Sequence, residues 1–250
     1  MNSTPINAAP MNATPMNSSS QHADQPGSGR FTSVATISPV TPRQVLQRCR
    51  LMPVVSIDNA DHAVPLANAL LEGGINVIEI TLRTPAALAA IEAIAAAVPD
   101  MWVGAGTLVR PEQINAIAQA GARFVLSPGA TPAIHEAVRV QGMPFIPGVA
   151  TASDIMLAMA AGLDAFKFFP AQSMGGVATL QAFAGPFADA LFCPTGGIKP
   201  ETAANFLSLD NVACVGGSWL TPAALLREQQ WSAISALARQ SLALLDGPVE

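Results

Sequence analysis

Apolar residues gather in eight short runs, and each run has the length and the aromatic or β-branched content of a buried strand. The runs cover residues 52–57, 77–82, 102–107, 124–129, 145–150, 165–170, 191–196 and 212–218. Ala- and Leu-rich stretches with helical spacing lie between them, for example over residues 62–72 and 85–97. The pattern therefore predicts eight strand-then-helix units.

The spacing of the runs indicates how these units are arranged. Successive runs begin 20 to 26 residues apart, which leaves room for one strand, one helix and two short loops. Such alternation is typical of a parallel sheet, and eight units in about 200 residues favour an α/β fold, a single (β/α)8 TIM barrel. An open doubly wound sheet is the alternative. It is less favoured because residues 57–61, at the first strand-to-helix junction, contain no Gly-x-Gly turn.

The first forty residues differ from the rest. Asp24 and Arg30 are their only acidic or basic residues, and asparagine recurs every five positions from Asn2 to Asn17. A segment without apolar periodicity cannot bury a core, and it has neither the apolar centre of a secretory signal nor the arginines of a mitochondrial presequence. We predict a low-complexity, disordered tail over residues 1–40 and a barrel domain over residues 41–250.

Composition narrows the possible partners and the compartment. Half of the residues are hydrophobic, the formal net charge is −5, and no basic run could follow a nucleic-acid backbone. Every apolar stretch is broken before the roughly 18 to 20 residues of a membrane helix, so we expect no nucleic acid and no membrane as partners. Cys49, Cys193 and Cys214 lack metal-ligand spacing, which indicates reduced thiols in a cytoplasmic protein.

The candidate catalytic and binding residues lie at the carboxyl ends of the predicted strands, because a barrel of this type holds its active site there. Lys167 is the strongest candidate, since it stands in the middle of an apolar strand and is one of only two lysines in the chain. Burial disfavours a charged ammonium, and a neutral amine is the nucleophile that Schiff-base chemistry needs. The alternative is a structural ion pair with Glu79 or a side chain that extends to the strand end.

Glu79 also interrupts an apolar strand, and it shares the alternation of Thr81 and Arg83, so that all three should face one side. If that side is the barrel interior, Glu79 can act as general acid and base beside Lys167. Arg83 would then lie at the mouth, where a guanidinium can hold a substrate carboxylate through two hydrogen bonds.

Two glycine-rich strand ends are suited to a phosphate group. Gly196 and Gly197 precede a helix that should open near Pro200, and Gly217 and Ser218 precede one that should open near Pro222. The loops after the seventh and eighth strands form the usual phosphate site of such barrels, although glycines also serve simple turns. The three histidines lie far apart in the sequence, so we expect no metal site.

Five motifs in register give the chain a family resemblance. They are Glu79-Ile-Thr-Leu-Arg83, Gly104-Ala-Gly-Thr107, Phe166-Lys-Phe-Phe-Pro-Ala171, Pro194-Thr-Gly-Gly-Ile198 and Gly216-Gly-Ser-Trp219. From about Arg43 onward the sequence resembles the bacterial 2-dehydro-3-deoxy-6-phosphogluconate (KDPG) aldolases, which often act on 4-hydroxy-2-oxoglutarate (KHG) as well. The resemblance implies a class I aldolase of the Entner–Doudoroff pathway. It also implies a homotrimer, a phosphorylated keto acid as substrate, and no metal or cofactor.

The resemblance also implies roles for individual residues. Lys167 matches the Schiff-base lysine and Glu79 the proton-transfer glutamate of the family. Arg83 and Thr107 match the residues that bind the pyruvate end of the substrate, and Thr195 matches a threonine of the substrate pocket. The phosphate site of the family falls on Gly196, Gly197, Gly217 and Ser218. The tail has no counterpart in the family.

Three other functions remain open at the level of sequence. Aldolases of the related 6-phosphogalactonate type share the lysine strand, but they usually differ at the positions of Thr81, Arg83 and Thr195. A phosphosugar isomerase on the same barrel would use acid and base residues without an imine. A barrel that only binds a sugar phosphate would release no pyruvate.

Overall fold

A computed structural model of the chain describes residues 40–246. The predicted tail over residues 1–40 lies, apart from Val40, outside the described residues. The predicted runs all form strands: β1 (Leu51–Val55), β2 (Val77–Thr81), β3 (Trp102–Gly106), β4 (Phe124–Leu126), β5 (Phe145–Ile146), β6 (Gly148–Val149), β7 (Ala165–Phe168), β8 (Leu191–Pro194) and β9 (Val215–Gly217).

The fifth run differs from its prediction because it forms two short strands, β5 and β6, on either side of Pro147. A proline has no backbone N–H for the sheet and so interrupts the pairing on one side. The Pro147 carbonyl still accepts a hydrogen bond of 2.9 Å from the backbone N–H of Lys167. β5 and β6 therefore occupy a single strand position in the barrel.

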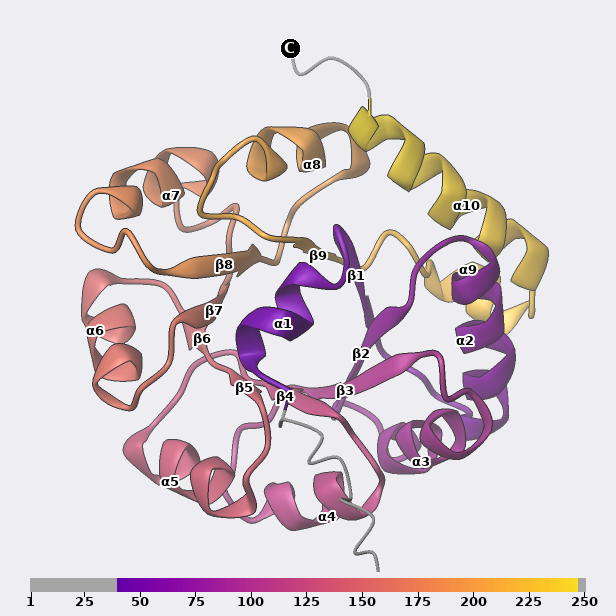
Figure 1. Cartoon of the computed structure of the whole chain (residues 1–250). Helices are drawn as coiled ribbons and strands as arrows, with labels where there is room; N and C mark the ends of the chain where they lie inside the picture. Colours follow the sequence, from indigo (N-terminus) through magenta and orange to yellow (C-terminus); the bar gives the residue numbers. More distant parts are fainter. Residues whose placement is uncertain (1–39, 247–250) are drawn as a thin grey trace, which may run out of the picture. The chain divides into compact units, whose positions relative to one another are not determined.

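The strands close into a parallel ring. One sheet has the order β5-β4-β3-β2-β1-β9, and the other has the order β6-β7-β8. Parallel bridges Phe192↔Val212 and Thr195↔Gly216 join the two sheets between β8 and β9. Figure 1 shows the strands around a central axis with the helices that follow β1 in the chain outside them, which is the predicted (β/α)8 barrel.

Of the helices in residues 40–246, one precedes β1, and the others lie between or after the strands in chain order. They are α1 (Pro42–Gln47), α2 (Ala63–Glu72), α3 (Ala87–Ala97), α4 (Gln113–Gln119), α5 (Pro132–Gln141), α6 (Ala152–Ala160), α7 (Gly176–Ala184), α8 (Pro200–Leu207), α9 (Ala223–Arg227) and α10 (Trp231–Ala243), with the 3-10 turns η1 (Ala60–His62) and η2 (Leu244–Asp246). Pro200 opens α8 as predicted, whereas Pro222 lies one residue before the short α9.

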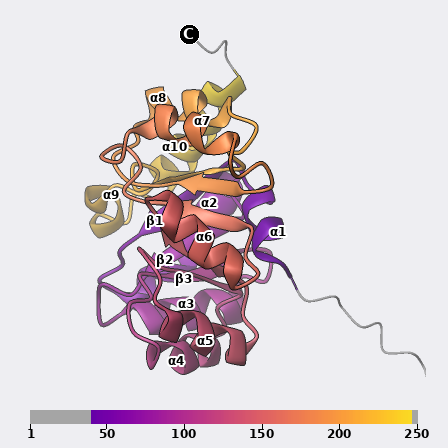
Figure 2. The ribbon, with the colours of Figure 1, turned by 90° about the vertical axis from the view of Figure 1, so that its left-hand side faces the viewer.

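Helix α1 closes the amino end of the barrel. Val45 and Leu46 are fully buried, and they pack against residues at the starts of the strands, among them Met52 and Val77. Figure 1 shows α1 across the middle of the ring, and Figure 2 shows it at one end of the barrel with α9 at the other. The carboxyl ends of the strands are left as the open end.

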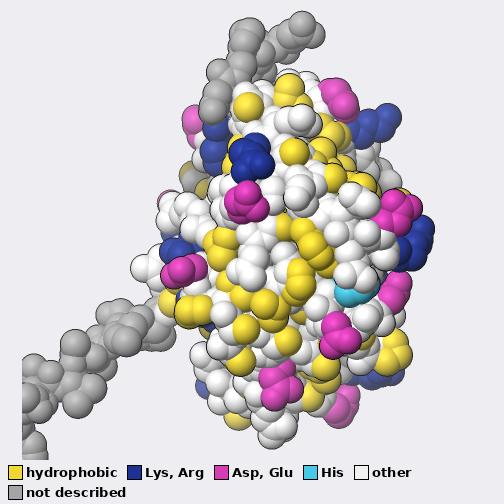
Figure 3. All heavy atoms as spheres, turned by 90° about the vertical axis from the view of Figure 1, so that its right-hand side faces the viewer, with side chains coloured by type: hydrophobic (Ala, Val, Ile, Leu, Met, Phe, Trp, Pro, Cys, Tyr) yellow, Lys and Arg dark blue, Asp and Glu magenta, His cyan; other side chains and the backbone are white. Residues whose placement is uncertain are grey.

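Charged side chains are spread over the outer surface. On the face formed by α2, α3, α9 and α10, acidic and basic side chains are interspersed among apolar ones (Figure 3). Within residues 40–246, no helix is long and apolar enough to cross a membrane.

Candidate active site

A lysine and a glutamate meet inside the barrel. Lys167 of β7 donates hydrogen bonds from Nζ to both carboxylate oxygens of Glu79 of β2, at 2.8 Å to Oε1 and 3.0 Å to Oε2. Lys167 is 3% exposed and Glu79 is 0% exposed. Two opposite charges this deep in a protein are stable only when they are paired, so each side chain holds the other in place.

The alternation of each strand aims these side chains inward. In β7, Phe166 and Phe168 join the core between the strands and the helices, while Ala165 joins the cluster inside the barrel. Lys167 therefore points into the barrel, between two outward phenylalanines. The same alternation in β2 sends Ile78 and Ile80 outward and Glu79 inward.

A glycine in β3 makes room for the carboxylate. A Cβ atom at Gly106 would lie 1.9 Å from Glu79 Oε1, and one at Gly104 would lie 2.2 Å from the ring of Phe124. Any side chain at either position would displace its neighbour. The motif Gly104-Ala-Gly thus has a structural reason, because its two glycines leave space for the ring of Phe124 and for the carboxylate of Glu79.

The ammonium group also affects its other neighbours. Lys167 Nζ lies 5.6 Å from the centre of the Phe169 ring, within the range of a cation–π contact. Lys167 pairs in register with Cys193 of β8. A hydrogen bond with Cys214 is the largest cause that lowers the pKa of the Cys193 thiol, and the Thr195 hydroxyl and the Lys167 charge act in the same direction against burial.

A cavity of about 370 Å³ opens above the pair at the carboxyl ends of the strands. Its walls come from the ends of β1, β7, β8 and β9 and from the residues that follow them. The lining residues are Val54, Ser56, Arg83, Lys167, Phe169, Thr195, Gly196, Gly197, Ile198, Gly216, Gly217, Ser218, Thr221, Ala223 and Leu226. A small molecule can thus reach the lysine through the carboxyl end of the barrel.

Most residues singled out from the sequence lie around this cavity. Lys167, Arg83, Thr195, Gly196, Gly197, Gly217 and Ser218 line it, and Glu79 lies behind Lys167. Arg83 is exposed, and its side chain makes no hydrogen bond or ion pair with any residue of the described range 40–246. Its guanidinium is therefore available to an anion that enters the cavity.

Thr107 is placed differently from the other predicted residues. It follows Gly106 at the end of β3 but does not line the cavity. Its backbone has φ = 64°, a left-handed conformation that a β-branched residue rarely adopts. Such strain is often found at functional sites, and Thr107 directly follows Gly106, the residue that lies against the Glu79 carboxylate.

Ser56 is a cavity residue that the sequence analysis missed. The Thr81 hydroxyl donates its hydrogen to the carbonyl of Val55 at 2.9 Å. In the 2.9 Å contact between Ser56 Oγ and Thr81 Oγ1, Ser56 must therefore be the donor. Ser56 lines the cavity, and its oxygen keeps lone pairs that can accept a hydrogen bond from a ligand. The sequence feature that could have identified Ser56 is a hydroxyl side chain at the carboxyl end of the first predicted strand.

The glycines after β8 have backbone conformations that favour glycine. Gly196 has φ = 103° and Gly197 has φ = 76°. Both values lie in the region that residues with a Cβ atom rarely occupy. The backbone here approaches the cavity without side chains, so its polar groups can reach a ligand directly.

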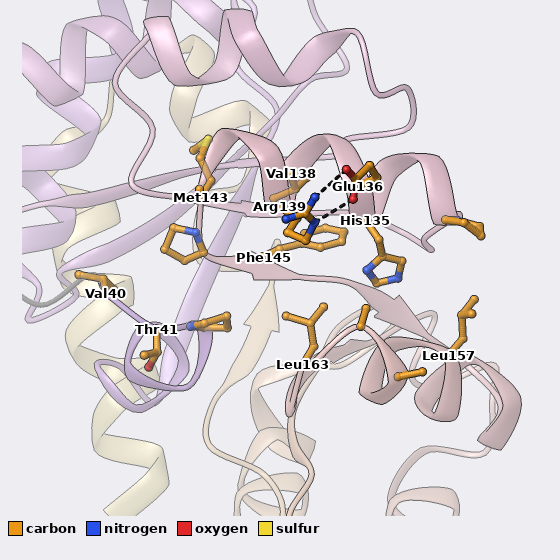
Figure 4. A pocket seen from close by; sticks show the side chains of 16 residues that line it. Val40, Thr41, His135, Glu136, Val138, Arg139, Met143, Phe145, Leu157 and Leu163 are labelled. Carbon is orange, nitrogen blue, oxygen red and sulfur yellow. Dashed lines mark hydrogen bonds and ion pairs between the residues drawn. The ribbon is translucent and has the colours of Figure 1, made fainter. Parts of the chain in front are cut away.

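A second, more open hollow of about 630 Å³ lies on the outside of the barrel. Figure 4 shows its lining, which includes Val40, Thr41, His135, Phe145, Leu157 and Leu163. Its charged side chains Glu136 and Arg139 are bonded to each other at 2.7 Å. Burial lowers the pKa of His135. This hollow contains no lysine, and its walls are mainly apolar.

No group of three or more His, Cys, Asp or Glu side chains in the described residues lies close enough to hold a metal ion. The site instead offers a primary amine, a carboxylate in hydrogen-bond contact with it, and an arginine at the mouth. An amine and an acid–base group in this contact can form and hydrolyse an imine with a keto compound. Together with the barrel, these groups define the class I, Schiff-base type of aldolase.

The comparison with known proteins identifies the family. The profile described as "KDPG and KHG aldolase" matches residues 43–237. The 2-dehydro-3-deoxy-phosphogluconate aldolase of Dickeya dadantii is 48% identical over 200 residues, which cover 80% of this chain and 94% of that protein. The chain belongs to the KDPG and KHG aldolase family.

Solved structures share the fold at similar identity. The KDPG aldolase of Legionella pneumophila, crystallised with pyruvate captured as a covalent carbinolamine intermediate, is 42% identical with a TM-score of 0.79, covering 81% of this chain and 98% of that one. The enzyme of Zymomonas mobilis ZM4, crystallised with 3-phosphoglycerate, is 41% identical with a TM-score of 0.75, covering 81% and 95%.

The buried pair should show strong energetic coupling. Lys167→Met and Glu79→Leu each leave one group without its partner, and each should lower the free energy of unfolding by about 3–5 kcal/mol. The double variant should recover most of that loss, because two apolar side chains of similar volume replace the pair. Urea denaturation at pH 7 measures all four proteins.

The exposed pair Glu136–Arg139 provides the matched control, because solvent screens it. Its double-mutant cycle, with Glu136→Gln and Arg139→Met, should give a much smaller coupling. Additive losses for the Lys167 and Glu79 variants would contradict the pairing.

Proposed function

We propose that this protein is a class I aldolase that cleaves KDPG to pyruvate and glyceraldehyde 3-phosphate through an imine on Lys167. The same site would cleave KHG to pyruvate and glyoxylate, and the first reaction belongs to the Entner–Doudoroff pathway. The observation that carries the proposal is the buried Lys167–Glu79 pair beneath an open cavity. Family membership and the carbinolamine in the Legionella relative support it.

The first half of the reaction forms the imine. Glu79 takes a proton from the Lys167 ammonium along the 2.8 Å hydrogen bond, and the neutral amine attacks the ketone carbon of the substrate. The resulting carbinolamine oxygen receives a proton from Glu79 and leaves as water. The product is a protonated imine, which withdraws electrons from the adjacent carbon.

The second half breaks the carbon–carbon bond. The Glu79 carboxylate takes the proton from the hydroxyl on carbon 4, the bond between carbons 3 and 4 breaks, and its electrons flow toward the imine nitrogen. The aldehyde leaves and an enamine remains. Carbon 3 of the enamine is then protonated, water adds to the imine carbon, and pyruvate leaves Lys167 free. Glu79 is the group positioned to return these protons.

The remaining residues would hold the two ends of the substrate. Arg83 would bind the carboxylate of the pyruvate half, with Thr107 and Thr195 beside that half. The backbone at Gly196 and Gly197 and the end of β9 at Gly217 and Ser218 would hold the phosphate. The 3-phosphoglycerate in the Zymomonas relative supports a phosphate-binding end in this family.

Variants at the pair test the proposal. Lys167→Ala should abolish pyruvate release from KDPG while the circular-dichroism spectrum stays that of a folded barrel. Glu79→Gln should slow turnover by roughly two to four orders of magnitude, because the principal acid–base group is lost. A lactate-dehydrogenase-coupled assay measures both. Substantial turnover by the alanine variant would refute the Schiff base on Lys167.

We further propose that three copies assemble and that the enzyme acts in the cytoplasm. Helix α6 exposes Met156, Leu157 and Met159 by 63%, 45% and 41% of their surface. Both methionines line an apolar hollow with Phe183 and Phe187 beside them. Apolar patches of this kind are typical of contacts between subunits. The three free cysteines fit a reducing compartment.

The assembly can be tested by changing the methionines. Sedimentation equilibrium should give three chains per particle for the wild-type protein. Met156→Lys with Met159→Lys should shift the particle to one chain, because two ammonium groups cannot be buried unpaired at a contact. A monomeric wild type, or a double variant that keeps three chains, would be evidence against this surface.

A further inference from the structure

Thr221 carries an unexplained hydroxyl group. Among residues 40–246 its Oγ1 is the one buried side-chain oxygen or nitrogen without a hydrogen-bond partner. The residue is only 6% exposed, and it lines the cavity that contains Lys167. Buried polar groups in native proteins almost always have partners, and an exception calls for a functional reason.

The surroundings of Thr221 indicate which partner could satisfy it. Its backbone N–H donates to the carbonyl of Ser218 at 3.3 Å, which folds the chain between β9 and α9 into a turn. Thr221 therefore lies beside Gly217 and Ser218 at the edge of the cavity. The neighbouring wall continues with Ala223 and Leu226, which are apolar. Among the described residues that line the cavity, Gly217, Ser218 and Thr221 offer backbone groups and hydroxyls, and the charged side chains are those of Arg83 and Lys167.

A threonine side chain can present either its methyl or its hydroxyl group to one place. The three staggered χ1 rotamers exchange the two groups, and a hydrogen-bond partner normally selects one rotamer. No such partner holds Thr221 in the described part of the chain. In the structure the protein buries Oγ1, so the hydroxyl reaches a ligand in the cavity only after a χ1 rotation that exchanges it with the methyl group; this rotation breaks no existing hydrogen bond.

We propose that Thr221 donates its hydroxyl hydrogen to a phosphate oxygen of the substrate and thereby favours phosphorylated over unphosphorylated keto acids. A phosphate group carries only acceptor oxygens at neutral pH, so a hydroxyl donor with no other partner suits it. This inference rests on the proposed function, which puts the phosphate at the Gly217–Ser218 end. It adds a side-chain donor to a site otherwise formed by the backbone and Ser218.

Three variants separate the hydroxyl from the shape of the side chain. Thr221→Val keeps the shape and removes the hydroxyl, whereas Thr221→Ser keeps the hydroxyl and removes the methyl group. Thr221→Ala is the second hydroxyl-free variant if the valine variant does not fold. Without ligand, Thr221→Val should melt at the same temperature as the wild type or higher, because an unpaired buried hydroxyl has been removed.

Binding is measured first, because it does not require catalysis. Thermal shifts over a concentration series of glycerol 3-phosphate should give a dissociation constant roughly 5- to 20-fold higher for Thr221→Val than for the wild type. The constant for Thr221→Ser should stay within about twofold of the wild type. Pyruvate, which would occupy the other end of the cavity, is the control ligand, and its binding should not change with either variant.

Kinetics then test the specificity. In Thr221→Val the KM for KDPG should rise by a similar factor with kcat nearly unchanged, while the KM for KHG stays constant. Unchanged binding of glycerol 3-phosphate by Thr221→Val would overturn the inference, and so would equal losses in Thr221→Val and Thr221→Ser. If the wild type binds glycerol 3-phosphate more tightly than Thr221→Val does but cleaves neither keto acid, the proposed function fails and the phosphate contact stands.

Discussion

The contact between Lys167 and Glu79 is the interaction on which the site depends. Lys167 is 3% exposed and Glu79 is 0% exposed, and removing two such charges from water is costly. Their mutual attraction and the hydrogen bonds of 2.8 and 3.0 Å offset that cost. Several features of the barrel follow from this pair. Gly106 leaves the space that the Glu79 carboxylate occupies. Phe166 and Phe168 of β7 face the helices, so that Lys167 between them faces the barrel interior.

Apolar packing contacts and candidate functional residues lie at opposite ends of the barrel. At the amino end, α1 packs Val45 and Leu46 into an apolar cluster with the starts of the strands. At the carboxyl end, small residues such as Gly216 leave a cavity into which Arg83, Thr195 and the lysine project. The cavity therefore brings a substrate to the amine at the end of the barrel where Arg83 and the glycine-rich loops lie.

The sequence predicted the parts of the fold and site that depend on periodicity. Alternation predicts that Glu79, Thr81 and Arg83 share one face, and the regular spacing favours the closed ring. That Glu79 and Lys167 face the barrel interior is seen only in the structure. The break at Pro147 and the strained backbone of Thr107 depend on local geometry that a pattern of residue types does not contain. Ser56 and Thr221 were missed because a single hydroxyl near a strand end resembles an ordinary turn residue until the cavity is known.

The most direct test of the central claim is to trap the imine. The protein is incubated with pyruvate, reduced with borohydride, digested and mapped by mass spectrometry. We predict a lactyl adduct on Lys167 and none on Lys199, the other lysine of the chain, which is exposed and serves as an internal control. A folded protein without an adduct, or with one on Lys199 alone, would contradict the account of this site.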